Sequence, residues 1–397
     1  MFFAEAVTLA HVARPAALAK LLVQHGFDVH IAQHPRYREL LGNLPVTEHE
    51  IYSISPQQFM QALAAGSPLY DLATLQAYVE EDLTIIAAVQ PDIIVGDFRL
   101  SLAVSAKIAG VPHIALANAY WSPFCRQSYT VPDLPMTNLL GPLLAQWLFS
   151  LARPIAFALH CIPMHKLRRS YGLTSLGFDL RKVYTFADYT LYADIPELYH
   201  MNKLPSNHRF IGPIAWSPDF PLPSWWTALP QGAPIVYVTL GSSGRASLLP
   251  ELIAALGQMN VVALISTAGA PVPEGVPDNV FVAAYLPGEE AVAMSSLVIC
   301  NGGSPTTHQA LVQGVPVIGV ATNLDQFLNM AAIEEAGAGR LLRASTCDAA
   351  TVSAAIERML ASESCQVASR NLAKQLICTS GSSEFLNVIN EISSGIG

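Results

Sequence analysis

Residues 297–320 read LVICNGGSPTTHQALVQGVPVIGV and contain a complete strand–loop–helix–strand unit. The apolar run Leu297–Cys300 predicts a buried strand, and Val315–Val320 predicts a second one. Between them, a loop with two glycines leads into a helix predicted over Thr306–Gln313. Two parallel strands need a crossover connection of this kind, so the segment predicts part of a parallel sheet covered by helices.

The same alternation of apolar runs and amphipathic helices continues on both sides of this segment. The further strands predicted here are Pro234–Leu240, Val261–Thr267, Val280–Ala284 and Arg340–Leu342, and the further helices are Leu248–Met259 and Gln326–Ala336.

The first half of the chain repeats this pattern, with an interruption at residues 120–184. That interruption contains aromatic residues, prolines and long apolar helices without short strands, so it predicts a helical insertion over the sheet. The predicted helices Arg14–His25 and Ser101–Ala109 are each followed by a glycine, Gly26 and Gly110, which is typical of a helix end. The predicted strands are Phe2–Thr8, Phe27–Ala32, Pro91–Gly96, Pro112–Ala117, Tyr189–Ala193 and Arg209–Gly212.

A proline-rich stretch separates the two halves. Six prolines fall within residues 213–234, and proline disfavours both helix and sheet. We therefore predict an N-terminal domain over residues 1–212, a linker over 213–233, a second domain over 234–380, and a C-terminal helix over 381–397 that packs back on the first domain. The fold class is α/β, with two Rossmann-like, doubly wound domains that face a cleft.

Composition excludes several classes of protein. The 397 residues are 52% hydrophobic and 13% charged, with a net charge of −9, which excludes disorder and a nucleic-acid-binding surface. The most apolar stretch, Leu139–Pro163, is interrupted by polar residues and proline, so we expect no membrane-spanning helix. Glu5 lies where a signal peptide needs basic residues, and the six cysteines are scattered without a CxxC motif. These features predict a cytoplasmic protein with reduced thiols.

Two loops follow neighbouring predicted strands and are suited to bind an anion. The first contains Gly302 and Gly303 and leads into a helix, whose first amides carry partial positive charge. The second is residues 241–244, which read GSSG. Two such loops at one edge suggest a diphosphate site, although ordinary tight turns have the same composition. The candidate diphosphate ligands are Ser242, Ser243, Asn301, Ser304 and Thr306.

Residues 302–339, GGSPTTHQALVQGVPVIGVATNLDQFLNMAAIEEAGAG, resemble the donor-binding signature of inverting GT-B glycosyltransferases that use nucleotide sugars. This group includes UDP-glycosyltransferases and macrolide glycosyltransferases. Weaker similarities follow the family order, at residues 8–15 (TLAHVARP), 91–97 (PDIIVGD) and 234–241. The resemblance implies acceptor binding by the first domain and binding of a UDP- or dTDP-sugar by the second.

Three residues depart from the family signature. Asn301 replaces the usual histidine, Pro305 replaces a small residue, and Gln309 replaces the glutamate that contacts the ribose. An amide binds a hydroxyl less strongly than a carboxylate does, so these changes affect donor affinity and nucleotide identity more than the fold.

His11 and Asp97 are the candidate catalytic residues. We expect His11 at the end of the first strand, where an imidazole can take the proton of an acceptor hydroxyl at neutral pH. Asp97 ends another strand and can hold the imidazole in the correct tautomer. In the alternative interpretation His11 caps a helix and Asp97 is an acid in a turn.

The resemblance and the residue chemistry together suggest the remaining contacts. Asp325 and Gln326 can bind sugar hydroxyls, although Asp325 can equally be a helix N-cap, and the segment at Tyr285 matches the one that holds the base. No pair of carboxylates is placed to bind a metal, so we expect neither a metal nor a cofactor besides the nucleotide sugar. Trp121 and Phe124 in the insertion suit an apolar acceptor or a peripheral contact with lipid at the inner face of the membrane, or else pack a helical layer.

The sequence therefore predicts an inverting glycosyltransferase that moves a sugar to a hydroxyl of a hydrophobic small molecule or a lipid-like acceptor. Two alternatives remain open at this point: a nucleotide-sugar 2-epimerase, and a catalytically silent protein that binds a sugar nucleotide and supports a partner enzyme. A monomer and a homodimer are equally compatible with the sequence.

Overall fold

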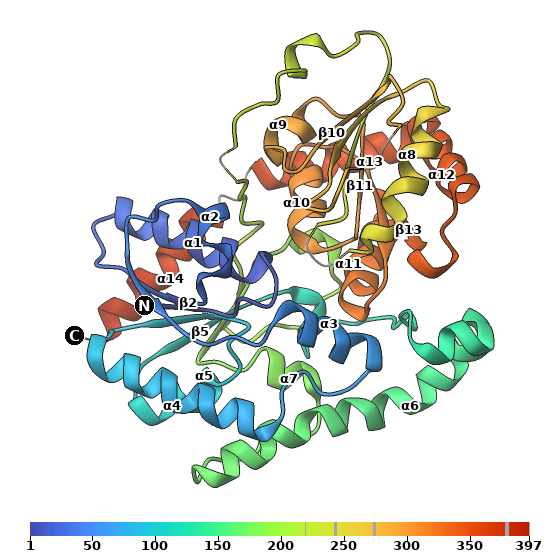
Figure 1. Cartoon of the computed structure of the whole chain (residues 1–397). Coiled ribbons are helices and arrows are strands. Elements are labelled where there is room, and N and C mark those ends of the chain that lie inside the picture. Colours follow the sequence, from blue (N-terminus) through green and yellow to red (C-terminus); the bar gives the residue numbers. More distant parts are fainter. Residues whose placement is uncertain (219, 242–243, 273–274, 378–380, 397) are drawn as a thin grey trace. The chain divides into compact units, whose positions relative to one another are not determined.

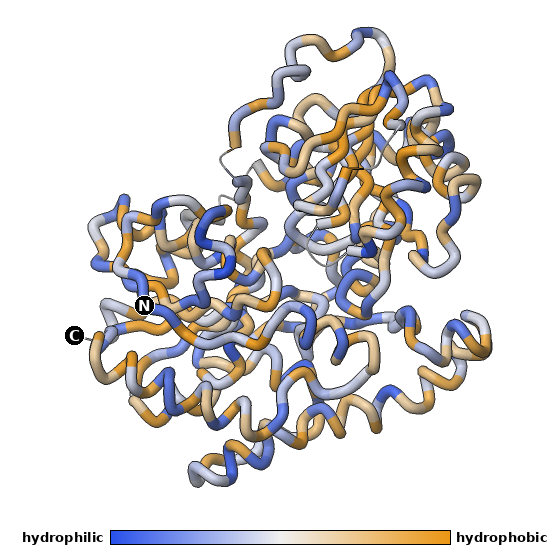
Figure 2. The backbone as a smooth tube through the Cα atoms, viewed as in Figure 1, coloured by the Kyte–Doolittle hydropathy of each residue, from blue (hydrophilic) through white to orange (hydrophobic). Residues whose placement is uncertain are grey.

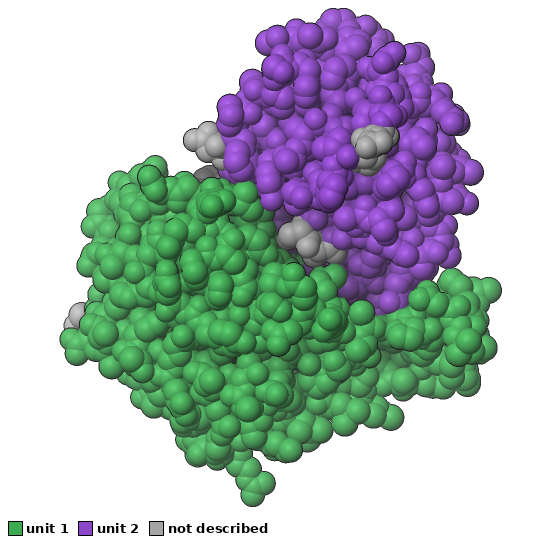
Figure 3. Space-filling model, viewed as in Figure 1, with its two compact units in different colours: residues 1–127, 134–216, 379–397 green, residues 128–133, 217–378 purple. Residues whose placement is uncertain are grey.

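The computed structural model describes residues 1–218, 220–241, 244–272, 275–377 and 381–396, and the chain divides into two compact units (Figure 3). Unit 1 comprises Met1–Gln127, Leu134–Trp216 and Thr379–Gly397, and unit 2 comprises Ser128–Asp133 and Ser217–Cys378.

Unit 1 is built on a parallel sheet with the strand order β3-β2-β1-β4-β5-β6-β7 among its described residues (Figure 1). The chain adds strands on one side of β1 and then on the other, which is the doubly wound arrangement expected from the sequence. The edge strand β3 was not predicted because its sequence, TEHE, has no apolar alternation. The strands are β1 (Phe2–Ala4), β2 (His30–Gln33), β3 (Thr47–Glu50), β4 (Ile94–Asp97), β5 (His113–Ala117), β6 (Tyr189–Tyr192) and β7 (His208–Phe210).

Helices cover both faces of this sheet, because successive strand residues point to opposite sides. Phe2 packs with Leu18 of α1 and Phe385 of α14, whereas Phe3 packs with Ile86 of α4 and Leu102 of α5. The C-terminal helix α14 therefore contributes to the core of unit 1. The helices of unit 1 are α1 (Ala10–Gln24), α2 (Arg38–Leu41), α3 (Pro56–Ala65), α4 (Leu72–Val89), α5 (Leu102–Ala109), α6 (Pro135–Ser170), α7 (Leu180–Tyr184) and α14 (Gly381–Ile396).

The end of α1 follows the predicted glycine cap. Gly26 has φ +82°, and the amide of Phe27 donates to the carbonyl of Leu22 at 3.2 Å. A non-glycine residue would be strained at this φ, so the glycine allows the chain to leave α1 and enter β2.

The helix α6 forms most of the predicted insertion, and apolar residues recur along its whole length (Figure 2). Contrary to our expectation for Leu139–Pro163, this helix is long and apolar enough to cross a membrane by length and composition, and little of its most apolar part is buried. The interrupting residues lower the hydropathy less than we expected. Length and composition alone are weak grounds for a span, because core helices of other proteins meet the same criteria.

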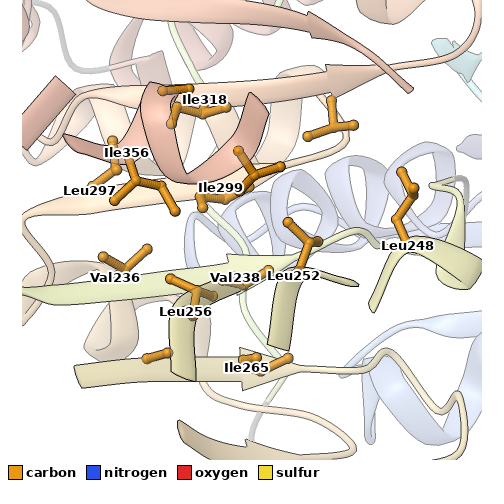
Figure 4. Packing of buried hydrophobic residues seen from close by; sticks show 14 of the residues in the cluster. Val236, Val238, Leu248, Leu252, Leu256, Ile265, Leu297, Ile299, Ile318 and Ile356 are labelled. Atoms are coloured by element: carbon orange, nitrogen blue, oxygen red, sulfur yellow. The ribbon is translucent and has the colours of Figure 1, made fainter. Parts of the chain in front are cut away.

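Unit 2 is a second parallel sheet with the order β10-β9-β8-β11-β12-β13 among its described residues. Its core lies between the sheet and helices α8 and α12, where Val238, Ile265 and Ile299 pack against Leu252 and Ile356 (Figure 4). The strands are β8 (Ile235–Thr239), β9 (Val262–Ser266), β10 (Val280–Ala283), β11 (Leu297–Cys300), β12 (Val317–Ala321) and β13 (Gly339–Arg343), and the helices are α8 (Leu249–Gly257), α9 (Gly288–Ala293), α10 (Ser304–Val312), α11 (Leu324–Glu335), α12 (Ala349–Ala361) and α13 (Glu363–Ile377).

A short segment from the first half of the chain, residues 128–133, belongs to unit 2 rather than to the insertion. Asp133 forms an ion pair with Arg343 at 2.7 Å and accepts a hydrogen bond from the amide of Ser345 at 2.9 Å. The sequence does not reveal this pairing, because more than 200 residues separate its partners.

Acid should destabilise unit 1 through His113. Burial lowers the pKa of this β5 histidine to about 4, partly offset by Asp188, against a usual value of 6.5. The unfolded chain therefore binds the proton more readily than the folded chain does. The contribution of His113 to stability is fully present above about pH 6.5 and is lost as the pH drops toward 4. We expect a loss of about 3 kcal/mol across this window from this residue. Urea denaturation at several pH values measures it. His113→Gln should flatten the dependence, whereas His25→Gln at the exposed end of α1 should leave it unchanged.

Candidate functional site

His11 lies in the first turn of helix α1, not at the end of the first strand. The strand β1 ends at Ala4, earlier than predicted, and residues 5–9 lead into the helix. His11 nevertheless meets Asp97, with its Nδ1 atom 2.7 Å from Oδ1. Asp97 is the last residue of β4 and pairs with Ala4 of β1, which brings the carboxylate to the start of α1. The predicted pair is therefore formed within unit 1.

The contact with Asp97 determines which nitrogen of His11 can act as a base. In the tautomer whose Nδ1 donates to the Asp97 carboxylate, Nε2 is the nitrogen that can accept a proton; Arg14 Nη2 also lies 3.3 Å from Nδ1. Asp97 is fully buried, whereas 18% of the His11 side chain is exposed to solvent. This is the arrangement of a general base supported by an aspartate.

Arg14 is a third member of this group that sequence reasoning missed. Its Nε donates to Oδ2 of Asp97 at 2.9 Å and its Nη2 donates to Oδ1 at 2.8 Å. Burial lowers the pKa of Arg14, but the Asp97 carboxylate outweighs this effect and the net pKa rises. Arg14 therefore fixes the orientation of the Asp97 carboxyl group through two hydrogen bonds. The spacing of three residues between His11 and Arg14, which places them on one helix face, was a signal that could have found it.

Two further strand ends complete the polar network. Arg14 Nη1 donates to Oδ1 of Asn118, which follows β5, at 3.1 Å. Asn118 in turn donates to Asp194, which follows β6, at 3.0 Å. The carboxyl ends of β4, β5 and β6 thus all contribute to the network, as expected for a site in an open parallel sheet.

An aromatic group lies next to His11. Phe98 follows Asp97 with φ +57°, a backbone conformation that is uncommon for a bulky residue, and its ring stacks on His11 at 4.8 Å. Tyr184 packs edge-on against Phe98 at 5.4 Å, and Trp121 packs against Tyr184 at 5.0 Å.

The two predicted acceptor residues therefore have different surroundings. Trp121 joins the aromatic group beside His11, whereas Phe124 packs against His208 of β7 at 5.1 Å. The structure does not bring Phe124 into contact with this group among the ring contacts of the described residues.

In unit 2 the predicted diphosphate loop lies between β11 and α10. The helix begins at Ser304, two residues earlier than expected, and its N-cap Gly303 has no side chain to cap it. Asn301 Oδ1 instead accepts from the amide of Gly303 at 3.0 Å, and Gly302 has φ +81°. Ser304 is buried and Thr306 is half-buried. The amides of the first turn can therefore receive an anion.

The two predicted loops of unit 2 lie side by side. The strands β8 and β11 are paired, and a Cβ atom placed on Gly241 would lie 3.5 Å from Nδ2 of Asn301. Ser242 and Ser243 lie outside the described residues. Sequence reasoning missed Asn329 of α11, which donates to the carbonyl of Gly302 at 2.8 Å and to Thr307 Oγ1 at 2.9 Å, and thereby holds the loop in place.

Gln309 and Tyr285, two other predicted donor residues, contact other segments of unit 2. Gln309 lies against the start of α9, where a Cβ atom on Gly288 would come within 2.7 Å of its Oε1. The ring of Tyr285 is half-buried and stacks on Phe220 at 5.2 Å.

Asp325 and Gln326 occupy the first turn of α11, but Asn323 is the N-cap of that helix. The capping interpretation of Asp325 is therefore wrong. Gln326 completes a capping box and is buried, and its Oε1 accepts from the amide and the hydroxyl of Thr322 at 2.8 and 2.9 Å. Its oxygen is thus engaged within the protein.

The part of the chain that the structure describes contains no cluster of three or more His, Cys, Asp or Glu side chains arranged to hold a metal ion. His30 and His34, four residues apart, lie on β2 and just after it, and His30 contacts His49 of β3 at 2.9 Å.

Comparison with known proteins agrees with this architecture. Residues 250–392 match the family model of the erythromycin biosynthesis protein CIII-like C-terminal domain. The chain is 48% identical over 374 residues to a PGL/p-HBAD biosynthesis glycosyltransferase of Mycobacterium tuberculosis, covering 94% of this chain and 87% of the relative. It is 49% identical over 373 residues to a PGL/p-HBAD biosynthesis rhamnosyltransferase of Mycobacterium bovis, covering 94% and 83%.

The fold is also found in a solved structure, the spinosyn rhamnosyltransferase SpnG complexed with thymidine diphosphate. The TM-score is 0.69 at 18% identity, over 98% of this chain and 99% of that chain. The predicted fold class is thereby confirmed. The chain belongs to the GT-B glycosyltransferase family that includes the PGL/p-HBAD biosynthesis glycosyltransferases, and it is a glycosyltransferase.

Proposed function

We propose that the enzyme transfers a deoxyhexose such as rhamnose from a dTDP-sugar to a hydroxyl of a hydrophobic, aromatic acceptor, with inversion at the anomeric carbon. The single observation that carries the proposal is the pair of His11 and Asp97, 2.7 Å apart, beside an aromatic group.

In the proposed reaction, Nε2 of His11 takes the proton of the acceptor hydroxyl. The oxygen then forms a bond to the anomeric carbon while the bond from that carbon to the phosphate oxygen breaks. The electron pair leaves with the nucleoside diphosphate. A single displacement of this kind inverts the configuration at the anomeric carbon. Asp97 stabilises the imidazolium that forms, and Arg14 keeps Asp97 in position.

We propose that the nucleotide sugar binds at the loop before α10. The amides of its first turn and the hydroxyl of Ser304 are suited to the leaving diphosphate, whose charge increases as the bond breaks. The relatives support the choice of donor: one is named a rhamnosyltransferase, and the SpnG structure holds thymidine diphosphate. We therefore favour dTDP over UDP.

We propose that the acceptor binds at the aromatic group beside His11. Phe98, Tyr184 and Trp121 offer ring faces and edges that suit an aromatic or apolar acceptor. The relatives are named for PGL/p-HBAD biosynthesis, and we propose an acceptor of the same class for this chain. The two alternative functions are not favoured, because these relatives are named as transferases.

A donor and acceptor panel tests the proposal. The enzyme is incubated with dTDP-rhamnose or UDP-glucose, together with 4-octylphenol or 1-octanol, and the nucleoside diphosphate and glycoside are measured by chromatography. We expect release of dTDP that depends on the phenol. Epimerised donor, or donor binding without release in any combination, would refute glycosyl transfer of the proposed kind.

Turnover should not require a divalent metal. Amides and hydroxyls at α10 supply the stabilisation that a cation gives elsewhere, so EDTA should leave the rate within about twofold. Loss of turnover with EDTA that Mg²⁺ or Mn²⁺ restores would contradict this expectation.

A further inference from the structure

The two sides of helix α6 differ in what they contact. Ala145, Phe149 and Cys161 are buried, and Cys161 packs into the core of unit 1 with Met164 and Leu167. The opposite side carries five large apolar side chains spaced four residues apart. Their exposed fractions are 91% for Leu143, 61% for Trp147, 60% for Leu151, 66% for Ile155 and 52% for Leu159.

Of these five residues, the central three, Trp147, Leu151 and Ile155, form a stripe on one face, because each step of four residues turns the side chain by only about 40°. Residues four apart follow one ridge of a helix, and a shift of two residues leads to the opposite side. The buried position 149 is two residues after Trp147, so around this stripe the helix has one buried side and one apolar side turned to solvent. Isolated exposed leucines are ordinary, but a contiguous stripe of this length indicates a docking surface.

The charges around the stripe suggest what docks there. The chain has a net charge of −9, yet residues 134–178 contain no Asp or Glu and include Arg153, Lys166, Arg168 and Arg169. Lys166 and Arg169 are exposed. An apolar stripe flanked by basic residues is complementary to a bilayer with anionic headgroups.

We propose that α6 lies flat on the surface of an anionic lipid bilayer, with the stripe of Trp147, Leu151 and Ile155 inserted among the acyl chains. Cys161, Met164 and Leu167 in the C-terminal part of α6 belong to the core of unit 1, and they attach this part of the helix to the unit. A helix anchored in this way would place the aromatic site of the same unit near lipid-like acceptors. The proposal stands on the stripe and its charges, and it does not depend on the donor or the acceptor of the reaction.

Vesicle flotation tests the proposal with the full chain. Wild-type protein is mixed with vesicles of phosphatidylcholine alone or of equal parts phosphatidylcholine and phosphatidylglycerol. We expect flotation with the anionic vesicles and weak flotation with the neutral ones. The variant W147Q/L151Q/I155Q should bind the anionic vesicles about 100-fold less well, because three inserted side chains are lost. The affinity of the variant K166Q/R169Q for anionic vesicles should fall about fivefold for each charge removed, and its binding to neutral vesicles should not change.

The matched control is I108Q/V312Q/V367Q, which replaces three apolar helix residues that are about two-fifths exposed and lie outside α6. It should float like the wild type. The proposal is overturned if wild-type protein fails to float with anionic vesicles, or if the stripe variant and the control bind them equally. It is also overturned if the wild-type protein binds no vesicles and gel filtration shows that it is a dimer. In that case the stripe variant would be a monomer and the control variant would remain a dimer. Because flotation needs no substrate, its outcome is separate from that of the transfer assay.

Discussion

Replacing His11 with alanine should lower kcat by about 10²–10⁴-fold, the usual contribution of a positioned general base. The variant removes the nitrogen that we propose takes the acceptor proton but leaves the donor loop of unit 2 intact. The dissociation constant for the donor should therefore stay within about twofold. Steady-state rates and calorimetric binding of dTDP on the same preparation measure both quantities.

Two variants serve as controls for this experiment. His25→Ala changes an exposed histidine at the other end of α1 and should leave kcat unchanged. Asp97→Asn keeps the imidazole but disturbs its tautomer, so it should reduce kcat less than His11→Ala does. Full turnover of His11→Ala, with only a lower melting temperature, would show that His11 is a helix-capping residue rather than the base.

Replacing Arg99 with methionine should destabilise unit 1 by about 3–5 kcal/mol, because it leaves buried carboxylates without their cation. Arg99 donates to Glu5 at 3.1 Å and to Asp82 at 3.0 Å, and all three side chains are fully buried. Burial raises the pKa of both carboxyl groups, and Arg99 opposes that rise. Without Arg99 the two carboxyl groups bind protons more readily in the folded protein. The loss of unfolding free energy caused by Arg99→Met should therefore become smaller as the pH falls from 7 toward 5.

Urea denaturation at both pH values measures this effect. The matched control is Arg38→Met, since Arg38 also pairs with two carboxylates, Glu48 and Glu50, but is half exposed. Exposed pairs contribute at most about 1 kcal/mol, so Arg38→Met should have little effect. Equal losses for the two variants would mean that burial of the Arg99 network does not matter for the stability of unit 1.

Much of the fold was predictable from local patterns. Apolar runs such as Leu297–Cys300 are buried strands in a parallel sheet, and these patterns are strong because both faces of the sheet are covered. The strand β3 escaped prediction because its residues are polar, and its pairing with β2 comes from tertiary structure. Residues 128–133 were assigned to the wrong unit because their partners, Arg343 and Ser345, are distant in sequence.

The site was predictable in its residue types but not in its geometry. His11 and Asp97 were both identified, and they are in contact, although His11 is in a helix. Nothing in the sequence specifies that Phe98 takes a left-handed conformation and stacks on His11, because that conformation depends on the surrounding packing. Similarly, Gln326 is engaged by its own capping box because Asn323, and not Asp325, is the N-cap of α11.

The anomeric configuration of the product tests the central claim most directly, that His11 activates a hydroxyl for a single displacement on a nucleotide sugar. The wild-type enzyme is supplied with a dTDP-sugar of known configuration and a phenol acceptor, and proton NMR gives the configuration of the glycoside formed. A base-assisted single displacement predicts a glycoside with the configuration opposite to that of the donor. A glycoside that retains the donor configuration would contradict it.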